Sequence, residues 1–210
     1  MLFRRNREIS RLEAFSDAGF GFALTLLPAF ACCFALLVWI WWEHNAFFRR
    51  YGLEDGLTVV LNGVLLFVVL FYVYPLKFMF DQFFGMFFRG PETAYKVMSL
   101  WELARSSAIY GFGFLVLFVM FALLYLRAYT RRAELDLPPI EVFDTKMFAG
   151  HHLVSASVGG LAVLVARYAP LRLAFLSPMT FALMGPAHWL FGTRADKRRK
   201  PLIARLQGEA

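Results

Sequence analysis

The sequence predicts an all-α membrane protein, a polytopic helical bundle of nominally six transmembrane helices. Of its 210 residues, 60% are hydrophobic and 18% aromatic, and 25 are phenylalanine, more than a soluble core of this length needs. Several apolar runs reach about 20 residues, the length of a membrane-spanning helix. The sequence lacks the ten-residue segments of alternating apolar and polar residues that are typical of a membrane β-barrel.

The chain begins with a basic segment and then enters a long apolar stretch over residues 18–42. A basic corner, Arg49-Arg50, follows it. Further spans are expected at about residues 57–78, 107–128, 147–166 and 171–191. The intervening segments are polar or carry breakers such as Gly90-Pro91 and Pro138-Pro139. We expect one transmembrane domain over 1–193 and a basic cytoplasmic tail over 194–210.

The net charge of +7 lies in short clusters between the apolar runs. Lys and Arg clusters of this kind orient membrane proteins, because they stay on the cytoplasmic side. They therefore indicate a lipid bilayer as partner, with no nucleic acid. Arg4, Arg5, Arg7 and Arg11 predict a cytoplasmic N-terminus, and Lys197-Arg198-Arg199-Lys200 predicts a cytoplasmic C-terminus.

Two cytoplasmic termini require an even number of crossings. Residues 57–191 supply four, so residues 18–42 must leave and return to make six. These 25 residues span only about 37 Å as one helix, whereas two crossings need roughly 40 residues. By the length of two spans, about twenty residues are therefore lacking between Leu27 and Pro28. We expect an omitted or abnormally short hairpin. The alternative is one merged span kinked at Pro28, with the N-terminus opposite Arg49-Arg50.

The stretch 11–26 reads RLEAFSDAGFGFALTL. Asp17 lies about one helical turn into a membrane segment, where an ionisable group is costly and usually functional. Arg11 is six residues away, roughly 240° around a helix, so the two do not pair within it. Asp17 therefore needs partners on another segment. The alternative is an ordinary helix start, with Ser16 or Asp17 as the cap and Arg11 at the membrane surface.

These residues carry a resemblance. The pattern Arg11-x-x-x-Phe15-Ser16-Asp17 resembles the RxxxFSD signature of the transmembrane-protein-175 family, the lysosomal-type potassium channels and their bacterial relatives. Further positions also fit that family: Phe20, Thr25, Leu26 and Leu27 in its first helix, Trp41-x-x-His44-Asn45-x-x-Phe48 at the end of its second, and Asp55 and Asn62 around the start of its third. A single His44 stands where the family more often has His-His.

The resemblance implies a potassium-permeable cation channel in the bacterial inner membrane, built as a homotetramer of single-repeat subunits. Four first helices would line the path, with an apolar constriction. Ala18, Phe22, Thr25 and Ala29 share one helical face. Phe22, Thr25 and Leu26 are the expected pore and gate residues, and Phe22 replaces the family's usual isoleucine or leucine. The alternative is an ordinary lipid- or helix-facing stripe.

The expected hairpin would place Asp17 and His44 at the same cytoplasmic depth. A polar network could then form from Arg11, Phe15, Ser16, Asp17, His44, Asn45 and Asn62. The alternative is that His44 and Asn45 are interfacial residues beside Trp41 and Trp42, in an aromatic belt.

No catalytic, cofactor or metal site is expected. His151 and His152 are adjacent and point about 100° apart, which makes a poor ligand pair, so they are interpreted as marking the start of a span. His188-Trp189 is interpreted as an interfacial anchor. Gly111-Phe112-Gly113 and Ser155-x-x-x-Gly159 favour close helix packing. Cys32 and Cys33 lie in an apolar run and are interpreted as small packing residues.

Two other functions compete with conduction. One is a non-conducting membrane scaffold or interaction protein of the same fold. The other is a membrane enzyme or carrier that uses Asp17 and His44 as a proton pair. That function needs a polar site at the membrane midplane, which the sequence does not suggest.

Overall fold

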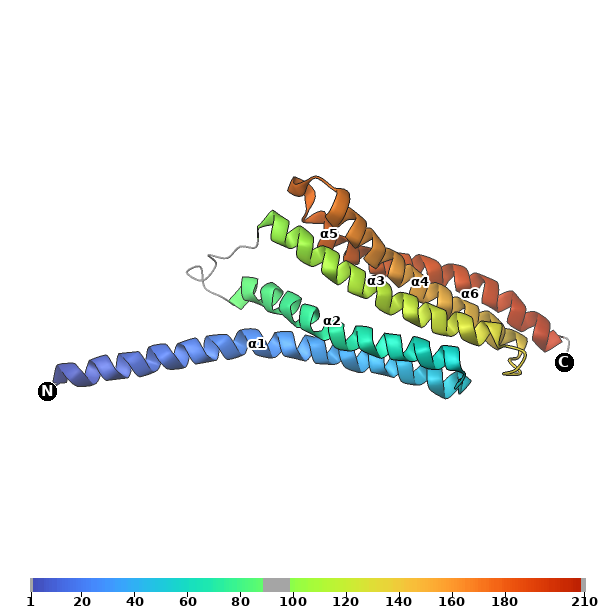
Figure 1. Cartoon of the computed structure of the whole chain (residues 1–210), viewed down its shortest axis with the longest axis horizontal. Helices are drawn as coiled ribbons and strands as arrows, with labels where there is room; N and C mark the ends of the chain where they lie inside the picture. The colour runs from blue at the N-terminus through green and yellow to red at the C-terminus, as the bar shows by residue number, and fades with distance from the viewer. Residues whose placement is uncertain (1, 89–98, 209–210) are drawn as a thin grey trace. The chain divides into compact units, whose positions relative to one another are not determined.

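A computed structural model describes the backbone of residues 2–88 and 99–208, and the side chains of residues 20, 27–80, 84 and 99–208. These residues are helical almost throughout (Figure 1). The elements are α1 (Leu2–Tyr51), α2 (Gly56–Phe88), α3 (Leu100–Thr130), α4 (Pro139–Tyr168), η2 (Leu171–Leu173), α5 (Leu176–Met179), η3 (Thr180–Leu183) and α6 (Met184–Gly208).

The chain divides into two compact units. The first comprises Met1–Trp39 and Val73–Val97, and the second comprises Ile40–Tyr72 and Met98–Ala210. In the first unit, the described side chains of Ala29, Cys33 and Leu76 are buried. Burial of Cys33 agrees with its interpretation as a small packing residue.

Four helical segments within the described residues are long and apolar enough to cross a bilayer. They are Leu27–Tyr51, Gly56–Phe80, Leu100–Thr130 and Pro139–Tyr168. The last three contain the spans expected at 57–78, 107–128 and 147–166. The all-helical membrane class predicted from the sequence is therefore confirmed.

The hairpin expected within residues 18–42 is wrong for this structure. α1 is a single helix of 50 residues, and Pro28 lies inside it. One proline removes one helix hydrogen bond. A turn between Leu27 and Ala29 would instead free several backbone groups in an apolar sequence, at several kcal/mol for each group left unpaired in hydrocarbon. The first two nominal helices are therefore one helix, and α1 contains no hairpin that would complete six crossings.

The turn between α1 and α2 is closed by local hydrogen bonds. Gly52 adopts a left-handed conformation (φ 57°), and its N–H donates to the Phe48 carbonyl at 2.9 Å. Glycine takes this conformation without the penalty that a Cβ brings. Asp55 then begins α2: its carbonyl accepts from the Val59 N–H at 3.0 Å, and its carboxylate accepts from the Thr58 hydroxyl at 2.5 Å.

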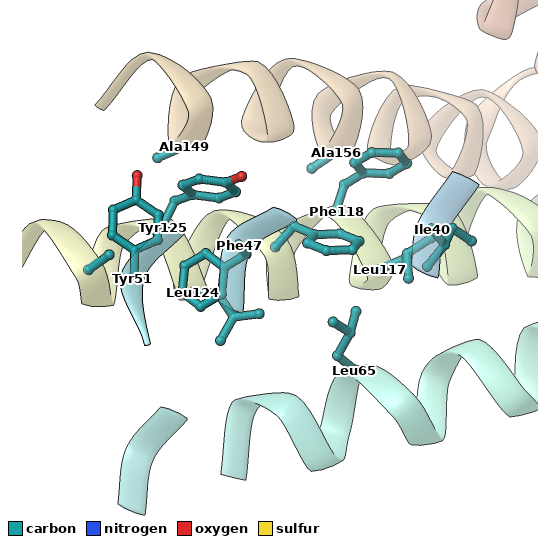
Figure 2. Close-up of a cluster of buried hydrophobic side chains, with 12 residues drawn as sticks. Ile40, Phe47, Tyr51, Leu65, Leu117, Phe118, Leu124, Tyr125, Ala149 and Ala156 are labelled. Atoms are coloured by element: carbon teal, nitrogen blue, oxygen red, sulfur yellow. The ribbon is translucent and has the colours of Figure 1, made fainter. Parts of the chain in front are cut away.

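The core of the second unit joins parts of α1, α2, α3 and α4 (Figure 2). Phe47 of α1 is fully buried and packs edge-to-face on Tyr125 of α3, with ring centroids 5.1 Å apart. Leu65 of α2 points into the same cluster. Tyr51 shares a hydrogen bond of 2.8 Å with Thr145 of α4. Aromatic side chains dominate this core, which accounts for part of the high phenylalanine content.

α3 and α4 cross closely at two glycines. A Cβ on Gly111 would lie 2.9 Å from the Gly159 carbonyl oxygen, and a Cβ on Gly159 would lie 2.9 Å from the Gly111 carbonyl oxygen. Such contacts are too short for a side chain, so each position requires glycine. The prediction that these glycines mark close helix packing is confirmed.

The helix expected over 171–191 is broken into η2, α5 and η3 before α6 begins. Pro170, Pro178 and Pro186 recur at eight-residue intervals, and each removes a backbone donor. This leg nevertheless returns along α4. Its successive contacts are the Ser177 hydroxyl donating to the Ala162 carbonyl at 2.8 Å and Arg199 bonded to Asp144 at 2.8 Å.

One end of the second unit gathers its ion pairs, and we call it the charged end. It is defined by Arg50, Asp55, Arg127, Asp144 and Arg199. Arg127 donates to one Asp55 oxygen from Nε at 3.1 Å and from Nη2 at 2.6 Å. Arg199 holds Asp144 through two bonds of 2.8 and 2.9 Å. The Arg50 guanidinium lies 5.2 Å above the Phe148 ring.

The ion pair of Asp55 with Arg127 at the charged end predicts how the stability of the protein changes in acid. The Arg127 and Thr58 hydrogen bonds lower its pKa from 3.8 to about 2. A lowered carboxyl pKa contributes stability that is fully present above the unfolded-state pKa and is lost as pH falls through the folded-state pKa. At neutral pH we expect Asp55→Asn to melt at a lower temperature than wild type, and the difference between the two to be at its largest. This difference should shrink as the pH falls from 3.8 to about 2.

The measurement is thermal unfolding of detergent-purified protein across that pH range. Glu54→Gln is the matched control, because Glu54 is the exposed carboxylate next to Asp55, and its curve should follow wild type. A constant difference between wild type and Asp55→Asn would contradict the assignment.

Candidate functional site

The structure brings together two of the predicted polar residues, His44 of α1 and Asn62 of α2. His44 Nε2 lies 2.7 Å from Asn62 Oδ1. Since the amide oxygen is an acceptor, Nε2 carries the proton and donates it. The other ring nitrogen, Nδ1, is then left as an acceptor. Both residues belong to the second unit.

Helical spacing explains why this polar pair faces inward. On α1, buried Ile40 and Phe47 flank His44 at i−4 and i+3, and the Phe48 ring lies 4.7 Å from the imidazole. On α2, Asn62 falls between Thr58 and Leu65, both fully or nearly fully buried. An imidazole placed between apolar neighbours needs a partner, and Asn62 supplies it.

The other network residues divide into two groups. Asn45 is half-buried on α1 and points about 100° away from His44. The side chains of Arg11, Phe15, Ser16 and Asp17 lie outside those that the structure describes. Asp17 belongs to the first unit and His44 to the second, so a network that joins them stays a prediction.

The predicted pore residues Phe22, Thr25 and Leu26 also lie outside the described side chains, although their backbone belongs to α1. The structure therefore describes only the helical backbone of these three residues.

A second polar cluster, which the sequence interpretation missed, joins α4 and α6. His188 Nδ1 lies 3.1 Å from His151 Nδ1, and His188 Nε2 lies 3.0 Å from the Ser155 hydroxyl. That hydroxyl is also within 3.4 Å of the His151 carbonyl oxygen. If Ser155 donates to this carbonyl, it accepts from His188 Nε2, and His151 Nδ1 then donates to His188 Nδ1.

A signal for this cluster was present in the sequence. His151 and His188 lie at nearly equal distances before and after Pro170, where the chain turns back. The sequence interpretation compared His151 only with its neighbour His152. Two imidazoles alone make a poor metal site, and within the described residues no group of three or more His, Cys, Asp and Glu side chains is arranged to hold a metal ion.

Comparison with known proteins shows which family the chain belongs to. No family model matches the sequence. A curated protein of Marivirga tractuosa named "Potassium channel" is 35% identical, with 95% of this chain and 92% of that protein covered. A crystal structure of a variant of the potassium channel MtTMEM175, in complex with a nanobody–MBP fusion, matches with a TM-score of 0.71 and 33% identity. It covers 89% of this chain and 93% of that one.

The chain belongs to the transmembrane-protein-175 family. The alignment with the Marivirga relative extends over 228 positions, more than the 210 residues of this chain. The relative therefore carries residues inside the aligned region that have no counterpart here.

The His44–Asn62 hydrogen bond can be measured by a double-mutant cycle. We expect Asn62→Leu to destabilise the protein by about 1–3 kcal/mol, because the imidazole loses its partner. His44→Phe with Asn62→Leu should cost less than the two single changes added together, since neither polar group is then left behind. The measurement is thermal unfolding in detergent. Additive effects would show that the two side chains are not coupled.

Proposed function

We propose that this chain is the subunit of a potassium-permeable cation channel. The observation that carries the proposal is the 35% identity with a protein named potassium channel, over nearly the full length of both chains. The resemblance at RxxxFSD and the similarity in fold to a second potassium channel support it. Membership of this family also argues against a catalytic function.

We propose further that four subunits form the channel. A unit of this size has too few helices to surround a pore by itself. The N-terminal half of α1 from each subunit would line the path. Large apolar side chains of α1, including Leu27 and Phe34, are exposed within the single chain, which supports their contact with lipid or with neighbouring subunits.

Phe22 would form the narrowest apolar ring, and Thr25 a hydroxyl ring one turn away, with Leu26 beside them. A narrow apolar ring gates by dewetting, because water leaves a channel that offers it no hydrogen bonds. Arg11, Phe15, Ser16 and Asp17 would form the polar cluster at the end of the same helix, and His44, Asn45 and Asn62 a separate one.

The alternative is a non-conducting scaffold of the same fold. The bulk of Phe22 favours it, since four phenylalanines fill more of a narrow path than the isoleucine or leucine that is usual in the family. Ion flux from liposomes containing the purified protein distinguishes the two functions.

We expect Phe22→Ala to raise potassium flux and to weaken selectivity, because a smaller side chain eases hydration of the constriction. Thr25→Val should reduce flux, since it removes hydroxyls that replace part of the hydration shell of an ion. Phe30→Ala, which is off the stripe of Phe22 and Thr25, is the control and should change little.

The assay is potassium flux from proteoliposomes, with the tetramer content of each variant determined by cross-linking. Unchanged flux in both Phe22→Ala and Thr25→Val, with intact tetramers, would exclude the pore assignment and favour the scaffold.

We also propose that the charged end faces the cytoplasm of a bacterial cell, with the basic segment 194–210 on that side. Arg50, Arg127 and Arg199 all meet there, as the positive-inside rule requires of a cytoplasmic face. A reporter fused at Ala210 should therefore be cytoplasmic, and a periplasmic signal would contradict the proposal.

A second reporter at Met1 tests α1. The N-terminal arginines predict that Met1 is also cytoplasmic, as an even number of crossings requires. A single crossing by α1 predicts the opposite side. The two fusions together therefore show whether α1 crosses the membrane once.

A further inference from the structure

A pocket of about 430 Å³ lies at the charged end of the second unit, where α1, α3, α4 and α6 meet. Its walls combine charged, aromatic and imidazole side chains, and this combination defines the chemistry of a ligand.

Acceptors for hydrogen bonds converge on this pocket. Glu43 of α1 and Asp196 of α6 bring carboxylates to its wall. His152 of α4 also lines it and is only 3% exposed, yet its Nδ1 has no hydrogen-bond partner among the described residues. That nitrogen is itself covered by protein atoms, so the carboxylates are the acceptors that a ligand can reach. A ligand that donates N–H groups would give them hydrogen bonds and a counter-charge.

One cation belongs to the same wall. Arg50 lines the pocket, and its guanidinium lies 5.2 Å above the Phe148 ring. Arg199, three residues beyond Asp196, uses two nitrogens on Asp144. The pocket thus pairs two carboxylates with one guanidinium, so a ligand with both an ammonium and an anionic group matches it better than a purely anionic ligand.

The position of the pocket indicates where such a ligand comes from. Trp42 is exposed and lines the pocket, and exposed tryptophans mark the headgroup level of a bilayer. Phe148 and Phe191 continue the aromatic wall. A lipid could therefore place its headgroup in the pocket while its acyl chains stay along the apolar surface of the helices.

We propose that this pocket binds the headgroup of an aminophospholipid of the phosphatidylethanolamine class. The primary ammonium donates to Glu43 and Asp196, and the phosphate accepts from Arg50. A trimethylammonium headgroup has the same charge but no N–H to donate, so the two carboxylates receive no hydrogen bond from it. The inference depends on the membrane location of the protein and is independent of conduction.

The test uses purified full-length protein in detergent, with phosphatidylethanolamine, phosphatidylcholine and phosphatidylglycerol of identical acyl chains. Retained lipid is measured by native mass spectrometry, and lipid-dependent protection by thermal unfolding. We expect phosphatidylethanolamine to bind about tenfold more tightly than the other two, equivalent to about 1.4 kcal/mol. Equal retention of the three lipids would overturn the proposal.

Substitutions of the two pocket carboxylates test whether the lipid binds in this pocket. Asp196→Asn and Glu43→Gln should each reduce the preference for phosphatidylethanolamine over phosphatidylcholine, and Glu54→Gln, a carboxylate that does not line the pocket, should leave it unchanged. Melting in lipid-free detergent confirms that each variant is folded, and Asp196 is exposed enough for its change to be tolerated. A preference that survives both pocket changes would overturn the assignment.

Soluble glycerophosphoethanolamine distinguishes a lipid from a free headgroup. The lipid should protect the protein at concentrations where the soluble headgroup does not. Equal protection by the two would mean a water-soluble ligand and would reject the lipid as occupant. Potassium flux is not used as a readout, so failure of this proposal and failure of the channel proposal are separate results.

Discussion

The helices of this protein depend on one constraint: a backbone N–H or C=O in hydrocarbon must be paired within its own segment. The constraint explains why α1 continues through Pro28, since one lost hydrogen bond costs less than a turn without polar residues. It also explains where the chain does turn. Gly52 and Asp55 close the turn between α1 and α2 with hydrogen bonds of their own, beside residues that ion pairs hold in place.

Polar side chains within the bundle follow the same rule, and they meet in pairs from different helices. His44 reaches Asn62, Tyr51 reaches Thr145, and His151 reaches His188. Each pair satisfies groups that would be costly alone, and each fixes the register of two helices against one another. His152 departs from this pattern, because its Nδ1 has no partner among the described residues.

Hydropathy predicted the membrane class and three of the spans, because long apolar runs have few alternatives in a bilayer. It failed over 171–191, where the composition is apolar but prolines at 170, 178 and 186 divide the segment into short helices. The prediction of a hairpin within residues 18–42 was wrong for another reason. The basic clusters at both termini require an even number of crossings, and the hairpin was predicted to supply it. Whether a helix turns depends instead on its local sequence, and residues 18–42 offer few polar groups to close a turn. His151 and His188 were missed because contacts across a helical hairpin depend on where the chain turns, and adjacency in sequence does not show this.

The arrangement of two motifs on one helix bears directly on function. The family motif at Arg11–Asp17 and the second pattern at Trp41–Phe48 are both present, and the alignment with the Marivirga relative covers 92% of that protein. The missing residues are therefore internal to the aligned region, and both motifs now lie on one continuous helix. In the channel that we propose, the pore needs only the first of these motifs, from four subunits. The second motif contributes His44, which bonds Asn62 of α2, and within the same stretch Phe47 packs on Tyr125 of α3. Each motif thus keeps the residues that its proposed role requires.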